Sequence, residues 1–106
     1  MPKYLIQASY TADGVKGVLQ DGGSGRRAAA QKAIQGLGGK LEAFYFTFGE
    51  RDAVLICDLP DTAAAMALSL TVNASGAVKA STTPLISVEE VDAACKKSVA
   101  YRAPGA

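Results

Sequence analysis

A hairpin with two apolar faces is the feature that most restricts the fold of this 106-residue chain. Large apolar residues alternate through Leu41–Phe48 and Ala53–Leu59, on either side of Gly49–Asp52. This alternation predicts two strands joined by a tight turn. Because successive strand residues point to opposite faces, both faces carry apolar side chains. The chain's own helices can cover one face, and no segment is left to cover the other.

A strand and an interrupted helix precede the hairpin. Lys3–Tyr10 alternates over a short length, which predicts a strand. Thr11 is suited to cap a helix whose apolar residues then recur at helical spacing. The glycine-rich run Asp21–Gly25 interrupts this helix, and Gly38-Gly39 ends its second part.

A helix, a strand and a further helix follow the hairpin. Pro60-Asp61 begins an alanine-rich helix that runs to about Val72. Ala77–Thr83 is the fourth predicted strand, and Pro84 ends it. Ser87–Glu90 is a capping box at the start of a terminal helix.

The predicted order is therefore βαββαβ with a terminal helix, in one domain of residues 1–106. This is the split βαβ arrangement of the ferredoxin-like α+β folds. Because each β-α-β crossover is right-handed, both main helices are expected on one face of a four-stranded antiparallel sheet.

A two-residue hairpin loop at Glu50-Arg51 would set the register of the central strands. It pairs Phe48 with Ala53, Phe46 with Leu55 and Phe44 with Cys57, all on the face expected beneath the helices. The uncovered face then holds residues of all four strands: Leu41, Ala43, Tyr45, Thr47, Val54 and Ile56 of the hairpin, Gln7 and Ser9 of the first strand, and Lys79, Ser81 and Thr83 of the last.

An uncovered apolar patch of this kind predicts association. Burying each large side chain would stabilise the protein by roughly 1.5–3 kcal/mol. A twofold partner would bury all of them at once, so we expect a homodimer or a larger homo-oligomer. The alternative is that the terminal helix folds over the patch within one chain.

Composition excludes several classes of function. Lys and Arg number 11 against 10 acidic residues, a balance that argues against nucleic-acid binding. No apolar run reaches the roughly 18 residues of a membrane span, and the first residues enter a strand pattern rather than a signal peptide, so a cytoplasmic protein is expected. Histidine is absent, which excludes Ser-His and Cys-His nucleophile pairs and histidine ligation of metal or haem. No cofactor or metal is predicted, and Cys57 and Cys95 are expected to be reduced thiols.

Two groups of polar residues are candidate ligand sites. Ser24, Arg26 and Arg27 lie in or after the glycine-rich run, where backbone N–H groups and guanidinium groups could hold a carboxylate or phosphate. The alternative is a helix break with two solvated arginines. The second group lies on the uncovered sheet face and could line a ligand pocket inside an oligomer: Gln7, Ser9, Tyr45 and Lys79, with Ser81 and Thr83 beside them. The alternative is that ordered water or hydrogen bonds between copies satisfy these polar groups.

Three functions remain open at this point. The first is a homo-oligomer that binds a small ligand, with an anion as one candidate. The second is a cofactor-free oxygenase or isomerase acting on a small carbonyl or aromatic compound, for which Tyr45, Tyr10, Asp52 and Arg26 are the candidate residues. The third is an assembly module with no ligand.

Taken together, these motifs resemble the GYD domain family of small bacterial and archaeal proteins, from Tyr4 to about Ala94. The resemblance is carried by Tyr10-Thr11-Ala12-Asp13-Gly14, Gly22-Gly23-Ser24 with Arg26-Arg27, Leu37-Gly38-Gly39, Phe44-Tyr45-Phe46, Gly49-Glu50-Arg51-Asp52 and Thr82-Thr83-Pro84.

The resemblance implies a ferredoxin-like protomer of the dimeric α/β-barrel superfamily, paired sheet to sheet, and it implies no established activity. The motif that names the family has a glycine, a tyrosine and an aspartate at the hairpin turn. Gly49 and Asp52 fit this motif, whereas Arg51 stands where tyrosine is expected.

Overall fold

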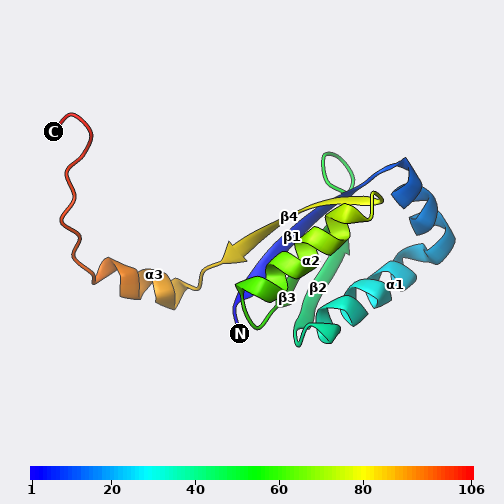
Figure 1. Ribbon diagram of the computed structural model, residues 1–106, viewed down its shortest axis with the longest axis horizontal. Helices are drawn as coiled ribbons and strands as arrows, with labels where there is room; N and C mark the ends of the chain where they lie inside the picture. Colours follow the sequence, from blue (N-terminus) through cyan, green and yellow to red (C-terminus); the bar gives the residue numbers. More distant parts are fainter.

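Four strands and three helices alternate in the computed structural model, which describes residues 1–106 (Figure 1). Their bounds are β1 Lys3–Tyr10, α1 Ala12–Gly36, β2 Lys40–Phe46, β3 Ala53–Asp58, α2 Thr62–Ala74, β4 Val78–Leu85 and α3 Val88–Cys95. The strands form one antiparallel sheet in the order β2-β3-β1-β4. The predicted ferredoxin-like α+β fold is therefore confirmed.

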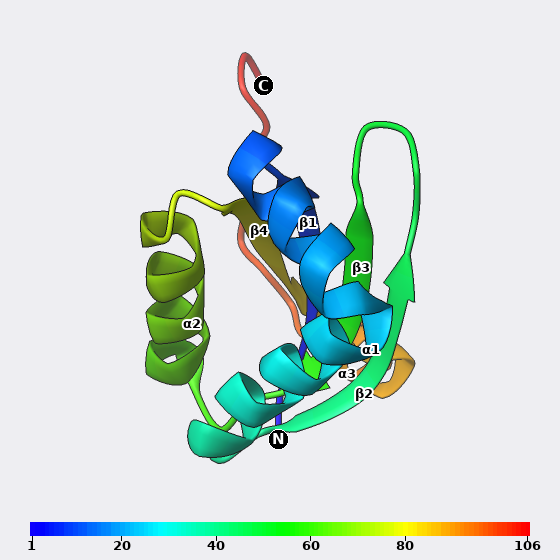
Figure 2. The ribbon, with the colours of Figure 1, turned by 90° about the vertical axis from the view of Figure 1, so that its right-hand side faces the viewer.

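Helices α1 and α2 lie on the same face of this sheet (Figure 2). The core between them is formed by alternate residues of the two central strands, by the residue that follows β3 and by one side of each of these helices: Tyr4, Ile6, Leu55, Cys57, Leu59, Ile34, Ala65 and Leu68. The other face of the sheet has no helix over it. We call it the open face.

The predicted break in the first helix is a kink at a single residue. Gly22 has φ 74° and ψ 170°, a conformation that glycine adopts at little cost, and the helix continues on both sides of it. Thr11 caps the first part by accepting a hydrogen bond from the Gly14 N–H, as its place in the sequence indicates. Ser24 lies in the first turn after the kink. The second part ends at Leu37 and Gly38, where φ is 82°.

The hairpin register differs from the prediction by two residues of β2. Phe46 lies opposite Ala53 and Phe44 opposite Leu55. The loop is longer than two residues because the Thr47 N–H donates to the Asp52 carbonyl oxygen (2.8 Å) and the Thr47 hydroxyl donates to the Arg51 carbonyl oxygen. Phe48 therefore lies in the loop and is fully exposed, so its predicted place beneath the helices is wrong.

A β-bulge in β2 moves a second residue. The register shifts between Leu41 and Ala43, so that Leu41 lies opposite Cys57 and packs against the core. Its predicted place on the open face is therefore wrong. The extra residue of the bulge, Glu42, has its side chain on the open face instead, where it reaches Lys3.

Strand β4 runs past Pro84 to Leu85, so the prediction that Pro84 ends the strand is wrong. Pro84 lies opposite Tyr4 in the sheet. Because β4 is an edge strand that pairs only with β1, it tolerates a residue without an N–H.

The terminal helix α3 does not cover the open face. The predicted capping box is present, because Ser87 and Glu90 bond each other's side chains and backbone N–H groups. No residue of α3 is buried, and the helix runs away from the body of the molecule (Figure 1). None of the three helices has the length and apolarity needed to cross a membrane.

Candidate functional site

The covered side of the sheet contains a cavity of about 160 Å³, between the strands and the two main helices. Fourteen of the seventeen lining residues are hydrophobic, and the other three are Arg26, Ser69 and Thr82. A space with this lining favours an apolar ligand and offers few polar groups to orient it.

Alanine side chains leave this space empty. Ala29, Ala30 and Ala33 of α1 face Ala53 and Ala80 of the sheet across the cavity. Larger neighbouring residues hold the helix and the sheet apart. One methyl group on each side is too short to fill that distance. The sequence contains these alanines, but their meeting depends on the phase of α1 after its kink, so sequence reasoning missed the cavity.

Arg26 is the one charged residue of the cavity lining. Its side chain is 32% exposed, and its nearest anionic partner is the Asp21 carboxylate at 3.7 Å from Nη1. At that distance the pair is an ion pair without a hydrogen bond, so the guanidinium N–H groups remain available to a ligand.

Ser24 and Arg27 lie at a different place from Arg26. Together with Gly23, Phe44 and Phe46 they line a second, more open depression, which shares Phe44 with the cavity. The structure thus separates the three residues that the sequence grouped as one anion site. The kink at Gly22 decides this separation because it sets which side of the following turns faces the sheet.

The other four candidate residues lie on the open face, across the sheet from the cavity. Gln7 lies between Val54 and Ser81 of the neighbouring strands, and Tyr45 lies opposite Val54. Ser9 lies opposite Lys79, and its hydroxyl donates to the Glu50 carbonyl oxygen (3.1 Å). These residues share one surface and cannot contribute to the cavity.

The centre of the open face is apolar. Val54 and Ile56 of β3 lie beside Tyr45 of β2, which is 69% exposed. Leu5 of β1 lies opposite Ile56 and extends the apolar patch to a third strand. Leu5 alternates with Gln7 and Ser9 along β1, so the sequence pattern also places Leu5 on the open face. The prediction did not include it.

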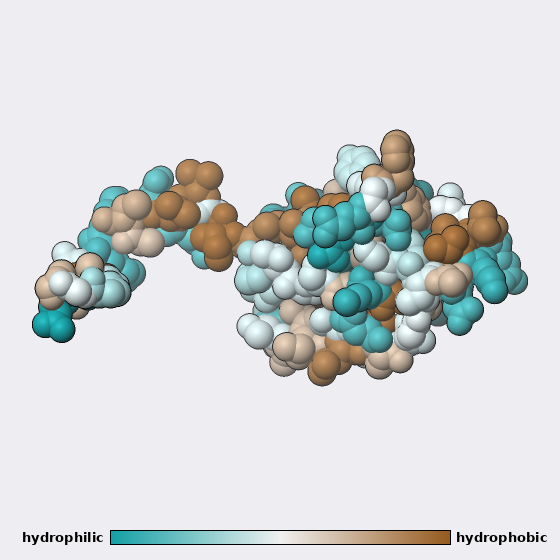
Figure 3. All heavy atoms as spheres, turned by 90° about the horizontal axis from the view of Figure 1, so that it is seen from above, coloured by the Kyte–Doolittle hydropathy of each residue, from teal (hydrophilic) through white to brown (hydrophobic).

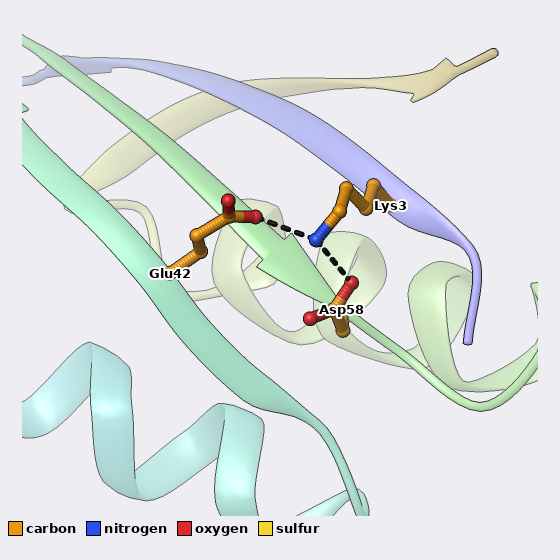
Figure 4. A network of polar contacts seen from close by, with 3 residues as sticks. All are labelled: Lys3, Glu42 and Asp58. Atoms are coloured by element: carbon orange, nitrogen blue, oxygen red, sulfur yellow. Dashed lines mark hydrogen bonds and ion pairs between the residues drawn. The ribbon is translucent and has the colours of Figure 1, made fainter. Parts of the chain in front are cut away.

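A network of three charged side chains lies at one end of the open face (Figure 4). Lys3 Nζ lies 2.7 Å from Glu42 Oε2 and 2.9 Å from Asp58 Oδ1. The hydrogen bond to Glu42, and then the one to Asp58, raise the pKa of Lys3 above its ordinary value. Because Lys3 is exposed, this network sets the local charge pattern more than it stabilises the fold.

The residues considered for catalysis do not converge on one site. Tyr10 and Arg26 line the cavity, whereas Tyr45 lies on the open face. The Asp52 carboxylate accepts a hydrogen bond from the Tyr10 backbone N–H (2.8 Å), and the Asp52 N–H donates to the Ala8 carbonyl oxygen (2.8 Å). Asp52 therefore ties the hairpin loop to β1. No group of three potential metal ligands lies together.

The two thiols have opposite environments. Cys57 is completely buried, whereas Cys95 is exposed. Burial raises the pKa of the Cys57 thiol to about 11, and the charge of Asp58 acts in the same direction. At pH 8 the Cys57 thiol is therefore protonated and inaccessible to reagents.

We expect a thiol reagent such as dithionitrobenzoate to modify Cys95 alone in dilute, folded protein at pH 8. Cys57 should react only after denaturant unfolds the chain, because its raised pKa and its burial both oppose reaction. Counting released thiolate before and after unfolding, with Cys95→Ser as the control, measures both steps. Rapid reaction of two thiols in the folded protein would contradict the buried position of Cys57.

The family model of the GYD domain matches residues 4–95. The match begins at Tyr4 in β1 and ends at Cys95, the last residue of α3. No curated protein and no solved structure has a significant match to the chain.

Proposed function

Since its family model covers most of the sequence, the chain belongs to the GYD domain family, whose function is unknown, and we propose that it binds small apolar molecules with an acidic group in the cavity between α1, α2 and the sheet. The observation that carries this proposal is an apolar cavity with a single guanidinium, that of Arg26, in its lining. The apolar part of the ligand would occupy the cavity, and its carboxylate would pair with Arg26.

The cavity volume limits the size of the ligand. An apolar protein cavity of about 150 Å³ is large enough to hold benzene. The volume here, about 160 Å³, therefore fits one six-membered ring or a short alkyl chain. A benzoate-like molecule would bury its ring and keep its carboxylate at the partly exposed guanidinium.

A test compares two probes that differ by one carboxylate, 4-fluorobenzoate and fluorobenzene, observed by fluorine NMR. We expect fluorobenzoate to bind about tenfold more tightly, because a charge-assisted hydrogen bond at a partly exposed site is worth about 1.4 kcal/mol. Arg26→Gln should remove this preference and leave fluorobenzene binding unchanged. Arg27→Gln is the matched control, since the neighbouring residue does not line the cavity.

A filled cavity should bind neither probe. Ala30→Leu adds a branched side chain to the lining, whereas Ala28→Leu adds the same side chain at an exposed position of the same helix. If both probes bind Ala30→Leu as they bind the parent, or if neither binds the parent, the cavity is not the site.

A second proposal concerns association of copies through the open face, which the sequence also predicts. Its support is the patch of Leu5, Val54, Ile56 and Tyr45, which neither main helix nor α3 covers. Antiparallel sheets that face water usually carry polar residues on that side, and here the centre is apolar. Gln7, Ser9, Tyr45 and Lys79 would then line the space between two sheets.

A further inference from the structure

Helix α3 is well formed but packs on nothing. Its capping box satisfies the first N–H groups, and no residue of the helix is buried. Val88, Val91 and Cys95 recur at i, i+3 and i+7, so they form one apolar stripe, and Ile86 precedes the cap. We call residues 86–95, which follow β4 and include α3, the arm. Figure 3 shows hydrophobic residues gathered along the arm and at its junction with the body. Such a stripe in water indicates a missing partner surface.

The arm extends well beyond the body formed by the sheet, α1 and α2 (Figure 1). The radius of gyration is 17.1 Å, whereas a compact chain of this length has about 13 Å. The molecule is 56 Å long and only 22 Å across its shortest dimension. The stripe therefore lies beyond the sheet from which the arm emerges, within reach of a neighbouring molecule.

The extent of the family match is an argument for which neighbour fits. It extends through Cys95, so α3 belongs to the domain that family members share, although it has no packing partner in its own chain. A partner available to every chain with this domain is a second copy of the chain. A partner particular to one protein would not explain why the helix belongs to the shared domain.

The arm also begins at the rim of the open face. Leu85, the last residue of β4, lies opposite Lys3 on that face, and Ile86 follows directly. Two copies joined through their open faces would therefore each start an arm at the edge of the shared interface. The 8-residue helix is about 12 Å long, enough to lie along the rim of the opposite sheet.

We propose that α3 clasps a second copy of the chain, packing its Val88-Val91-Cys95 stripe against the partner's sheet in a twofold exchange of arms. This inference rests on the proposed association through the open face. In a twofold assembly the two arms make the same contact with the opposite copy. Each substitution in the stripe is therefore present at two places in the interface.

The test uses a charge placed on either side of α3. Val91→Asp puts a carboxylate in the stripe, and Ala93→Asp puts one on the opposite side of the same short helix. Both positions are exposed in the single chain, so neither variant should unfold the domain. By sedimentation velocity, we expect Val91→Asp to raise the dissociation constant at least about tenfold, and Ala93→Asp to change it less than about twofold.

The native Cys95 thiol reports on the arm itself. If the arm packs on a second copy, modification of Cys95 should slow as protein concentration rises through the dissociation constant, and Val91→Asp should abolish this slowing. Equal association of both variants, with Cys95 equally reactive at all concentrations, would overturn the arm exchange while leaving association through the open face intact. Protection of Cys95 in dilute single copies would also overturn it, because the arm would then fold onto its own sheet. A chain that never associates would refute both proposals.

Discussion

Under the proposed association through the open face, Ile56→Asp is expected to leave the protein as single copies. Ile56 lies at the centre of the open face, with Leu5 opposite on one neighbouring strand and Ala43 on the other. A carboxylate there would be buried between two sheets beside a lysine, Lys3, that already pairs with Glu42 and Asp58, and the apolar contact of the isoleucine would be lost as well. We expect the dissociation constant to rise at least about a hundredfold, measured by sedimentation velocity.

The fold of the single chain should survive this change. Ile56 points away from the core beneath the helices and is only partly covered in one copy. The far-ultraviolet circular dichroism of Ile56→Asp should therefore match that of the parent. Met66→Asp, on the exposed side of α2, is the control for adding a charge, and it should leave association unchanged. An Ile56→Asp protein that sediments like an associating parent would refute the open face as the interface.

The element order and the covered face could be predicted because both depend on local pattern. The alternation of Lys3–Tyr10 and of the hairpin defines the strands, and the capping residues Thr11 and Ser87 mark helix starts that the structure contains. These signals act over a few residues, so they do not depend on where the rest of the chain lies.

The register of β2 could not be predicted in the same way. A two-residue turn is the commonest hairpin, but Thr47 bonds across the wider loop to Asp52 and Arg51. The side chain of Glu42, the extra residue of the bulge, accepts a hydrogen bond from Lys3, which is 39 residues away in the sequence. Because a bulge inverts the alternation beyond it, one unpredicted residue moved Leu41 from one face to the other.

The candidate site was harder to predict than the fold. The cavity needs alanines of α1 and of two strands to meet, and no local pattern records such a meeting. Arg26 and Arg27 are equivalent in the sequence, and the kink at Gly22 alone decides which of them lines the cavity. Where a helix resumes after a glycine with positive φ, its phase is a property of the folded chain and cannot be read by counting residues.

Gly14→Ala should cause the largest loss of stability among the substitutions considered. Gly14 is buried in the first turn of α1, and a Cβ atom there would lie 2.0 Å from the Ala77 carbonyl oxygen. That carbonyl accepts a hydrogen bond from the Thr11 N–H (3.0 Å), while the Thr11 hydroxyl donates to the Gly76 carbonyl oxygen (2.9 Å). The new methyl group would therefore push α1 from the turn before β4 and weaken the bonds that hold them together. We expect the free energy of unfolding to fall by about 2–4 kcal/mol.

Gly17→Ala, one turn later in the same helix, should have the opposite sign. A Cβ atom at Gly17 would meet nothing within 4 Å, so only the helix preference of alanine acts, and the free energy of unfolding should rise by about 0.5–1 kcal/mol. Urea unfolding of both variants at one protein concentration keeps the contribution of association equal. If Gly14→Ala proved as stable as Gly17→Ala, the close approach of α1 to Ala77 would be wrong. In the structure, Gly14 is the residue of the Tyr10–Gly14 motif at which any side chain would have to move the helix. Equal stability of the two variants would remove this explanation of the motif.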